Sequence, residues 1–209
     1  MKKHIHLNAP MPNTLLDGKK TKTFNERKIN MRDQTYQRLT AYASSYPEEQ
    51  IYKEKMLQFL DTCSDCFLRS CRVGHFTASA FLLNPKKNHV LLLHHTKLDK
   101  WMQPGGHCDG DPDVLKVAIK EAQEESGIQK IRAIHSAVFD IDIHLIPPYK
   151  KEGAHYHFDI RFLLHAYETD RLIQNHEAKA LQWFKTTGDD LPENRASLDR
   201  MFEKIKNEK

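Results

Sequence analysis

The stretch "PGGHCDGDPDVLKVAIKEAQEESGI", residues 104–128, decides the fold, because a glycine turn leads directly into one amphipathic helix. Asp111 suits the N-cap, Pro112 suits the first helical position, and Gly127 suits the end, so the pattern predicts a helix over residues 112–126. One sector of this helix is apolar and contains Val114, Leu115, Ala118, Ile119 and Ala122. The helix is therefore expected to pack one side on a core.

An acidic sector adjoins that apolar sector. Glu121, Glu124 and Glu125 follow the i, i+3, i+4 spacing, and the helical wheel turns Glu125 toward the core side. Like charges at this spacing destabilise a helix by about 0.2–0.5 kcal/mol, and an unpaired carboxylate near a core costs more. A divalent cation that prefers oxygen ligands, Mg²⁺ or Mn²⁺, would offset both costs. A solvated acidic helix end is the alternative.

The flanking sequence predicts an α/β (α+β) fold with a mixed sheet. β-rich runs cover residues 75–84, 89–95, 131–146, 155–167 and 180–186, and a short strand at 100–107 enters the glycine turn. A last helix is expected from about Glu193 or Arg195 to Lys206. The order of strands, helix, strands and helix favours one sheet with helices packed on it.

The first 73 residues have a different character. Residues 1–24 look irregular, and the basic run Lys19, Lys20, Lys22 reads as a solvated tail. Helices are expected over residues 30–44 and from Ser45, which resembles a capping box with Glu48, to about residue 63. We interpret residues 1–73 as a tail and helical extension, and 74–209 as the main domain.

Two long strands carry alternating polar residues. One face collects His155, His157, Asp159 and Arg161 from one strand, and Asp140, Asp142 and His144 from the other. If the strands pair as a hairpin, these polar faces lie side by side. Histidine and aspartate bind metals and exchange protons near neutral pH, so a site is expected here, although the wet face of an antiparallel sheet is the alternative.

Composition bounds the class of protein. The chain has 209 residues, 39% hydrophobic residues and a net charge of +4, which fits one globular domain with an extension and does not by itself argue for nucleic acid. The sequence shows no signal peptide and no apolar run long enough to span a membrane. We therefore expect a cytoplasmic protein with reduced thiols.

The cysteines suggest a second metal hypothesis. Cys63 and Cys66 have the C-x-x-C spacing, and Cys71 with His75 could complete a zinc knuckle. The alternative is partly buried thiols at a helix end.

Residues 106–128 resemble the Nudix box, G-x5-E-x7-R-E-U-x-E-E-x-G-U, where U is aliphatic. The matching residues are Gly106, Glu121, Glu124, Glu125, Gly127 and Ile128. Pro112 stands where the family has its first glutamate, and Lys120 stands where it has arginine. The likeness covers roughly residues 74–209, and "GHCDGD" resembles a bacterial subgroup with a GHxDGD variant of the box.

The resemblance implies an α/β/α sandwich that hydrolyses a diphosphate linkage in a nucleoside diphosphate-X or nucleoside triphosphate, with Mg²⁺ or Mn²⁺. The implied metal ligands are Gly106, Glu121, Glu124 and Glu125, and Lys120 would hold the glutamates in place. For the general base we expect Glu124 first, and then His157, Asp159 or Glu177.

Substrate contacts are expected from the remaining polar and aromatic residues. Lys97, His107 and Arg161 could meet phosphates, and Trp101 and Tyr149 could stack on a base. Trp101 as a core residue and Lys97 as a surface residue are the alternatives. The paired strands would line the same cleft with Asp142, His144, His155, His157 and Asp159.

Two other functions remain open from sequence. A non-catalytic Nudix-fold module could bind a nucleotide and regulate a partner, as the changes at Pro112 and Lys120 suggest. A zinc hydrolase could use His144, His155, His157 and Asp142, although the chain lacks an HExxH pair. The expected partners are a nucleotide-type small molecule and a second copy in a homodimer.

Overall fold

The predicted mixed α/β architecture is confirmed by a computed structural model, which describes residues 31–149, 153–174, 178–193 and 198–208. The helices are α1 (Met31–Ala41), α2 (Pro47–Thr62), α3 (Val114–Ser126) and α4 (Asp199–Asn207). The strands are β1 (Gly74–Leu83), β2 (His89–His95), β3 (Lys100–Met102), β4 (Gly105–His107), β5 (Ile131–Ala133), β6 (Asp140–Ile146), β7 (His155–Ala166) and β8 (Ala178–Lys185). No helix in these described ranges has the length and apolarity to cross a membrane.

The sheet is built around β1 and β7, which run parallel from the pair Gly74–Tyr156 to the pair Leu83–His165. Both β5 and β6 pair antiparallel with β7. On its other edge β1 pairs with β4 near its beginning and with β2 near its end, and β2 continues the sheet to β3 and β8. All eight strands therefore form one mixed sheet.

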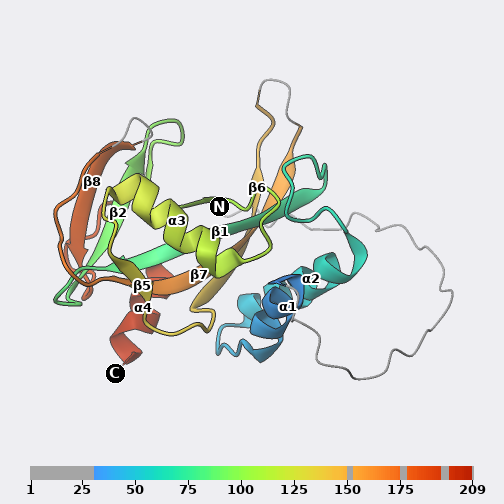
Figure 1. Cartoon of the computed structure of the whole chain (residues 1–209), viewed down its shortest axis with the longest axis horizontal. Helices are drawn as coiled ribbons and strands as arrows, with labels where there is room; N and C mark the ends of the chain where they lie inside the picture. The colour runs from blue at the N-terminus through green and yellow to red at the C-terminus, as the bar shows by residue number, and fades with distance from the viewer. Residues whose placement is uncertain (1–30, 150–152, 175–177, 194–197, 209) are drawn as a thin grey trace, which may run out of the picture.

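Alternation along β1 divides the core into two clusters. Phe76, Ala78, Ala80 and Leu82 belong to a cluster that includes the apolar side of α3 and residues of α1 and α2. Phe81 and Leu83 belong to a second cluster with Met201 and Phe202 of α4. Figure 1 shows α3 across one face of the sheet, with α1 and α2 beside it. The helical extension thus shares a core with the sheet.

Several predicted boundaries were wrong. The helix α3 begins at Val114 with Asp113 as its N-cap, because the Asp113 side chain accepts a hydrogen bond from the backbone N–H of Lys116. Asp111 instead accepts from the N–H of Asp113. At the other end, Gly127 adopts a φ of 75°, the left-handed conformation expected of a terminating glycine.

The capping box predicted at Ser45 is also wrong. Tyr46 is the N-cap of α2 and makes no side-chain capping bond, whereas Pro47 occupies the first turn as expected. Glu48 is not needed for capping and instead lies 3.3 Å from the guanidinium of Arg200. Only residues 31–41 of the first expected helix are helical; Asn30 and the basic run at 19–22 lie outside the described residues.

The single strand expected over residues 131–146 is two strands, β5 and β6. Both pair with β7, but His135–Val138 loop out between them, because Ile134 N–H donates to Leu163 and Phe139 N–H donates to Arg161. The four residues His135–Val138 therefore bulge out of the sheet, because β7 advances by only two residues, from Leu163 to Arg161, over the same distance. The last helix begins at Asp199 rather than near Glu193, and Arg195 lies outside the described residues.

A buried ion cluster joins the extension to the sheet. It consists of Glu49 from α2, Asp140 and Asp142 from β6, Asp159 and Arg161 from β7, and Arg200 and Lys204 from α4. Arg161 Nη1 lies 3.0 Å from Asp140, and Lys204 Nζ lies 2.7 Å from Glu49. Burial favours a neutral Asp140, but the hydrogen bond from Arg200 and the cations around it lower the pKa of its carboxyl below the ordinary value.

We predict that Glu49→Gln lowers the free energy of unfolding by about 3 kcal/mol, because removing one member of a buried ion pair leaves its partners under-compensated. Glu49 is fully buried and accepts hydrogen bonds from Tyr42, Lys204 and the N–H of Ile141. Urea unfolding of both proteins measures the change.

Glu48→Gln is the matched control, because Glu48 precedes Glu49 in the same helix turn, is 47% exposed and reaches only the rim of the cluster. Its loss should stay below about 1 kcal/mol. Equal losses for the two variants would contradict a structural role for the buried ion cluster.

Candidate functional site

Two carboxylates of α3 lie directly against the glycine strand β4. Glu125 is 6% exposed, and its Oε2 accepts a hydrogen bond of 2.8 Å from the N–H of Gly105. A Cβ added to Gly106 would lie 2.5 Å from Oε2 of Glu121. Glycine at position 106 is therefore what lets the Glu121 carboxylate approach the strand backbone.

The third carboxylate lies further out. Glu124 has 57% of its side chain exposed, compared with 16% for Glu121. Lys120 joins the two, because its Nζ lies 3.3 Å from Glu121 and 3.2 Å from Glu124. Desolvation opposes the charge on Lys120, but the carboxylates of Glu121 and Glu124 raise its pKa above the ordinary value. Lysine at this position thus bridges the glutamates as a cation.

The loop between β4 and α3 is held by the helical extension. The Thr35 hydroxyl of α1 donates a 2.8 Å hydrogen bond to the carbonyl of Pro112, and the N–H of Gly110 donates to the carbonyl of Phe67. Arg69 forms an ion pair with Asp109 in the same loop. The hydrogen bond from Arg69 lowers the pKa of the Asp109 carboxyl below its ordinary value, although burial favours the neutral form of this group. Pro112 therefore anchors this loop through its carbonyl group.

The donor set on α3 fits a hard divalent cation. Carboxylate oxygens from consecutive helical turns lie beside a strand whose glycines leave space for close approach. Mg²⁺ and Mn²⁺ take oxygen ligands of this kind, whereas structural zinc sites use sulfur and nitrogen. Glu121, Glu124 and Glu125 could hold such an ion together with the backbone of Gly106.

Polar residues of four neighbouring strands, β6, β7, β1 and β4, lie next to one another. As the alternation predicts, β6 pairs with β7 so that Asp142 faces Asp159 and His144 faces His157. The pairing of β1 then places His75 opposite His157. His107 of β4 lies opposite Thr77 of β1, and its ring centroid is 4.9 Å from that of His157. His107 directly follows Gly106 in β4, so this strand contributes a residue to the polar face as well as the backbone that meets the α3 carboxylates.

Three predicted substrate residues belong to the buried ion cluster. Arg161 is 2% exposed, and its guanidinium lies within 3.0 Å of Asp140, Asp142 and Asp159. Asp159 also accepts hydrogen bonds from other side chains, namely Thr77, Ser79 and Gln103. Asp142, Asp159 and Arg161 therefore lie next to the histidines along the same face of β6 and β7, and Arg161 contacts both aspartates.

Two histidines on this face, His107 and His157, are largely removed from solvent and crowded by other histidines. Burial is the main reason that the pKa of His107 falls from 6.5 to about 4. Burial, followed by the neighbouring His107 and His144, lowers the pKa of His157 still further, to about 2. Both imidazoles are neutral at pH 7 and keep a lone pair on one ring nitrogen.

The remaining predicted contacts lie apart from this face. Trp101 stacks on His94 with ring centroids 5.1 Å apart and meets Phe184 edge-on in the second core cluster. Lys97 is exposed in the turn between β2 and β3, and Tyr149 is 57% exposed beyond the end of β6. Glu177, expected as one possible base, lies outside the described residues.

The cysteine knuckle hypothesis is wrong for His75. The thiols of Cys63 and Cys71 lie 3.3 Å apart, and Cys66 is buried near Arg32. His75 instead groups with His155 and His157, and their ligand atoms all lie within 4.8 Å of one another. Across the described part of the chain, no other group of three such ligands comes this close.

Sequence reasoning missed His75, Thr77, Ser79 and Gln103 as members of the polar face. The strand that contains His75 was expected, but its parallel pairing with β7 joins residues 82 positions apart, as the hydrogen bond from Thr77 to Asp159 shows. Alternation along β1 was the available signal, because it places His75, Thr77 and Ser79 on one face.

A family model described as NUDIX domain matches residues 74–203, more than half of the chain. No protein of curated function matches the chain. Among solved structures, the C. elegans Ap4A hydrolase in a binary complex shares 19% identity, covers 63% of this chain and 95% of its own, and has a TM-score of 0.50. At this identity the likeness shows the fold alone.

Two further solved structures are similar. A UDP-X diphosphatase shares 16% identity, with 85% of this chain and 91% of that chain covered and a TM-score of 0.48. A MutT NUDIX hydrolase from Burkholderia pseudomallei shares 22% identity, with 62% and 96% covered and a TM-score of 0.47.

We predict that Gly106→Ala weakens Mn²⁺ binding by at least about 10-fold, since the added Cβ displaces the Glu121 carboxylate from β4. Electron paramagnetic resonance of free Mn²⁺ measures the affinity. Gly153→Ala is the matched control, because nothing lies within 4 Å of a Cβ at that position. Unchanged Mn²⁺ affinity in a folded Gly106→Ala protein would contradict the role given to this glycine.

A pH dependence follows from His157. Its folded pKa lies below the ordinary 6.5, so below pH 6.5 the unfolded chain takes up a proton that the folded chain does not. The associated stability is complete above pH 6.5 and falls as pH drops, by at most about 1.4 kcal/mol per pH unit.

Urea unfolding in EDTA at pH 7 and pH 5 compares the parent chain with His157→Gln. We expect the parent to lose up to about 2 kcal/mol more than the variant. Identical losses would show that the His157 imidazole titrates alike in the folded and unfolded chains.

Proposed function

Since this chain belongs to the Nudix family, we propose that it hydrolyses a diphosphate linkage in a nucleoside diphosphate-X or nucleoside triphosphate, with Mg²⁺ or Mn²⁺ as cofactor. One observation carries the proposal: Glu125 and Glu121 lie against Gly105 and Gly106, with Glu124 beside them. An acidic cluster fixed on a backbone in this way is suited to hold cations that neutralise a diphosphate.

We assign Glu121, Glu124, Glu125 and the backbone of Gly106 to the cation. A bound Mg²⁺ or Mn²⁺ supplies Lewis-acid chemistry, which neutralises phosphate charge and makes water a better nucleophile at neutral pH. The chain supplies fixed positions: the N–H of Gly105 orients Glu125, and Lys120 orients Glu121 and Glu124. Fixed carboxylates need little reorganisation when the substrate arrives.

Glu124 is the group we assign to accept the proton from the attacking water. It is the most exposed of the three glutamates, so its carboxylate can reach solvent and substrate together. Asp159 is less suited, because Ser79 and Arg161 already donate to its oxygens. His157 is less suited as well, because its strongly lowered pKa makes it a weak base.

Substrate recognition is assigned to the polar face next to β4. His107 follows Gly106 and faces β1, and His144 keeps 40% of its side chain exposed. Both can donate or accept hydrogen bonds at phosphate or ribose oxygens. We assign Arg161 an indirect role, because three carboxylates bind its guanidinium. It positions Asp142 and Asp159 beside the histidines on the same strand face. Trp101, Lys97 and Tyr149 remain candidates for the outer part of the substrate.

The first test is a panel of nucleoside triphosphates, dinucleoside polyphosphates and nucleotide sugars, assayed with Mg²⁺ and with Mn²⁺. We expect metal-dependent cleavage between phosphorus atoms, seen by ³¹P NMR as two phosphate-containing products. Nucleotide binding without turnover across the panel would favour the non-catalytic module. Turnover that requires Zn²⁺ and survives loss of the α3 carboxylates would favour the zinc hydrolase.

We further predict that Glu124→Gln lowers kcat on the best substrate by at least about 100-fold, because the loss of a charged ligand and base removes several kcal/mol of transition-state stabilisation. Glu54→Gln serves as the matched control, since Glu54 is an exposed glutamate on α2. If Glu124→Gln turns over as fast as Glu54→Gln, the assignment of Glu124 fails.

A further inference from the structure

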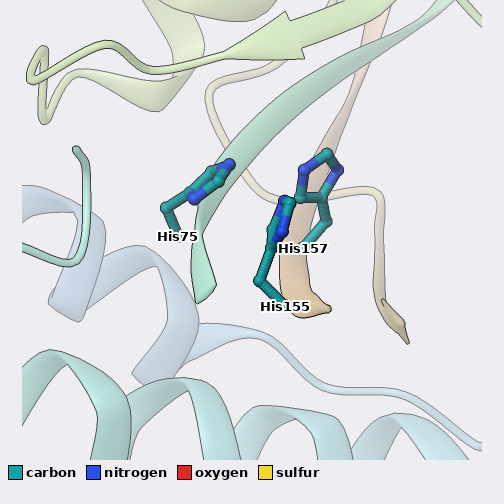
Figure 2. A group of neighbouring side chains, drawn as sticks. All are labelled: His75, His155 and His157. Atoms are coloured by element: carbon teal, nitrogen blue, oxygen red, sulfur yellow. The ribbon is translucent and has the colours of Figure 1, made fainter. Parts of the chain in front are cut away.

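Three imidazoles from two strands converge on the polar face outside the carboxylate cluster of α3. His75 is the second residue of β1, and His155 and His157 are the first and third residues of β7. Figure 2 shows their rings side by side above the starts of these strands. From this arrangement we propose that His75, His155 and His157 bind a first-row transition-metal ion, with Zn²⁺ as the reference ion, at a site additional to the Mg²⁺ or Mn²⁺ site of the proposed function.

The backbone fixes this grouping. His75 and His157 are direct partners in the parallel pairing of β1 and β7, so their side chains leave the same face of the sheet. His155 precedes His157 by two residues and therefore shares that face. The His75 ring centroid lies 5.0 Å from that of His155 and 4.9 Å from that of His157. Sheet pairing alone thus brings the three rings together.

The distances suit an imidazole site with small side-chain adjustment. One ligand nitrogen from each histidine lies within 4.8 Å of the other two. Zn–N bonds of 2.0–2.1 Å in tetrahedral geometry place two ligand nitrogens about 3.3 Å apart. The widest separation therefore shrinks by at most roughly 1.5 Å on binding, which rotation of the rings about their side-chain bonds can supply.

The hydrogen bonding of His155 leaves a nitrogen lone pair for a metal. His155 Nδ1 lies 2.9 Å from the carbonyl oxygen of Gly153, which can only accept, so Nδ1 carries the hydrogen and Nε2 keeps its lone pair. Metal-binding histidines characteristically donate their second N–H to a carbonyl or carboxylate in this way. Gly153 thus fixes the tautomer that His155 needs as a ligand.

His157 adds an independent indication. Its Nε2 is buried and makes no hydrogen bond with any residue that the structure describes. A buried polar atom without a hydrogen bond lowers stability, and a bound ion would offset that cost. Burial, and then the neighbouring His107 and His144, lower the pKa of His157 and keep its ring neutral, and a neutral ring is the form that binds metal.

The ligand type separates this site from the carboxylates of α3. Imidazole nitrogen suits Zn²⁺, Cu²⁺, Ni²⁺ and Fe²⁺, whereas carboxylate oxygen suits Mg²⁺ and Mn²⁺. The two sets of ligands also come from different elements, β1 and β7 against α3. Three protein ligands leave a fourth tetrahedral position open, so a water molecule or a phosphate oxygen could complete the coordination.

The test is metal binding by the full chain after dialysis against a chelator. Zn²⁺ is titrated in competition with a chromophoric zinc indicator, and Co²⁺ is added in a separate titration to read the visible absorption of tetrahedral coordination. We expect one equivalent of tightly bound Zn²⁺, unaffected by excess Mg²⁺. Weak Zn²⁺ binding without defined stoichiometry would overturn the proposal.

Variants locate the ion. His155→Gln and His157→Gln should each weaken Zn²⁺ binding by about 100-fold or more, because losing a ligand costs at least as much as losing its hydrogen-bond partner. His155 begins its strand and is only half-buried, so His155→Gln is expected to fold even if His157→Gln does not. Far-UV circular dichroism checks this.

Two controls separate the sites. His89→Gln removes a histidine at the beginning of β2, where it pairs with Lys185, and should leave Zn²⁺ affinity unchanged. Glu124→Gln should also keep it, even though it abolishes activity under the proposed function. If Glu124→Gln loses Zn²⁺ and the histidine variants keep it, the ion is bound by α3 and the three-histidine site does not exist.

Discussion

The contact between α3 and the glycine strand β4 is the constraint on which the site depends. Glu125 accepts a hydrogen bond from Gly105, and Glu121 occupies the space that a side chain at position 106 would fill. Like charges at the i, i+3 and i+4 positions of a helix repel, and the fold keeps the glutamates on this side of α3 because the apolar side of the helix is buried in the core. Packing energy thus maintains an acidic cluster that a cation can use.

The helical extension helps to hold α3 and the polar face in position. The hydroxyl of Thr35 holds the loop before α3 through Pro112, and Glu49 joins the buried ion cluster that includes the aspartates of the polar face. Because α1 and α2 share a core with the sheet, the extension is part of the framework that positions both the carboxylates and the histidines. An account of the site built from residues 74–209 alone would omit these contacts.

The sequence was most informative where local chemistry decides structure. The presence of a helix in this stretch, its end at Gly127 and the inward turn of Glu125 follow from periodicity and turn chemistry. The polar alternation of the two long strands was also visible, and the pairing of β6 with β7 places their polar faces side by side. It was least informative where distant segments meet. The burial of Arg161 among three aspartates depends on strand register, and the position of His75 depends on a parallel pair that no local pattern encodes. The capping error at Ser45 has a smaller cause, because a proline at position 47 can begin the helix without a side-chain cap.

The proposed function depends on divalent cations bound by the carboxylates of α3 at β4. Anomalous scattering from a crystal of the full chain soaked with Mn²⁺ tests it most directly, because the signal locates manganese without reference to activity. Peaks coordinated by Glu121, Glu124 and Glu125 are the predicted result. Manganese found elsewhere, with the three carboxylates turned away from β4 into solvent, would contradict the account.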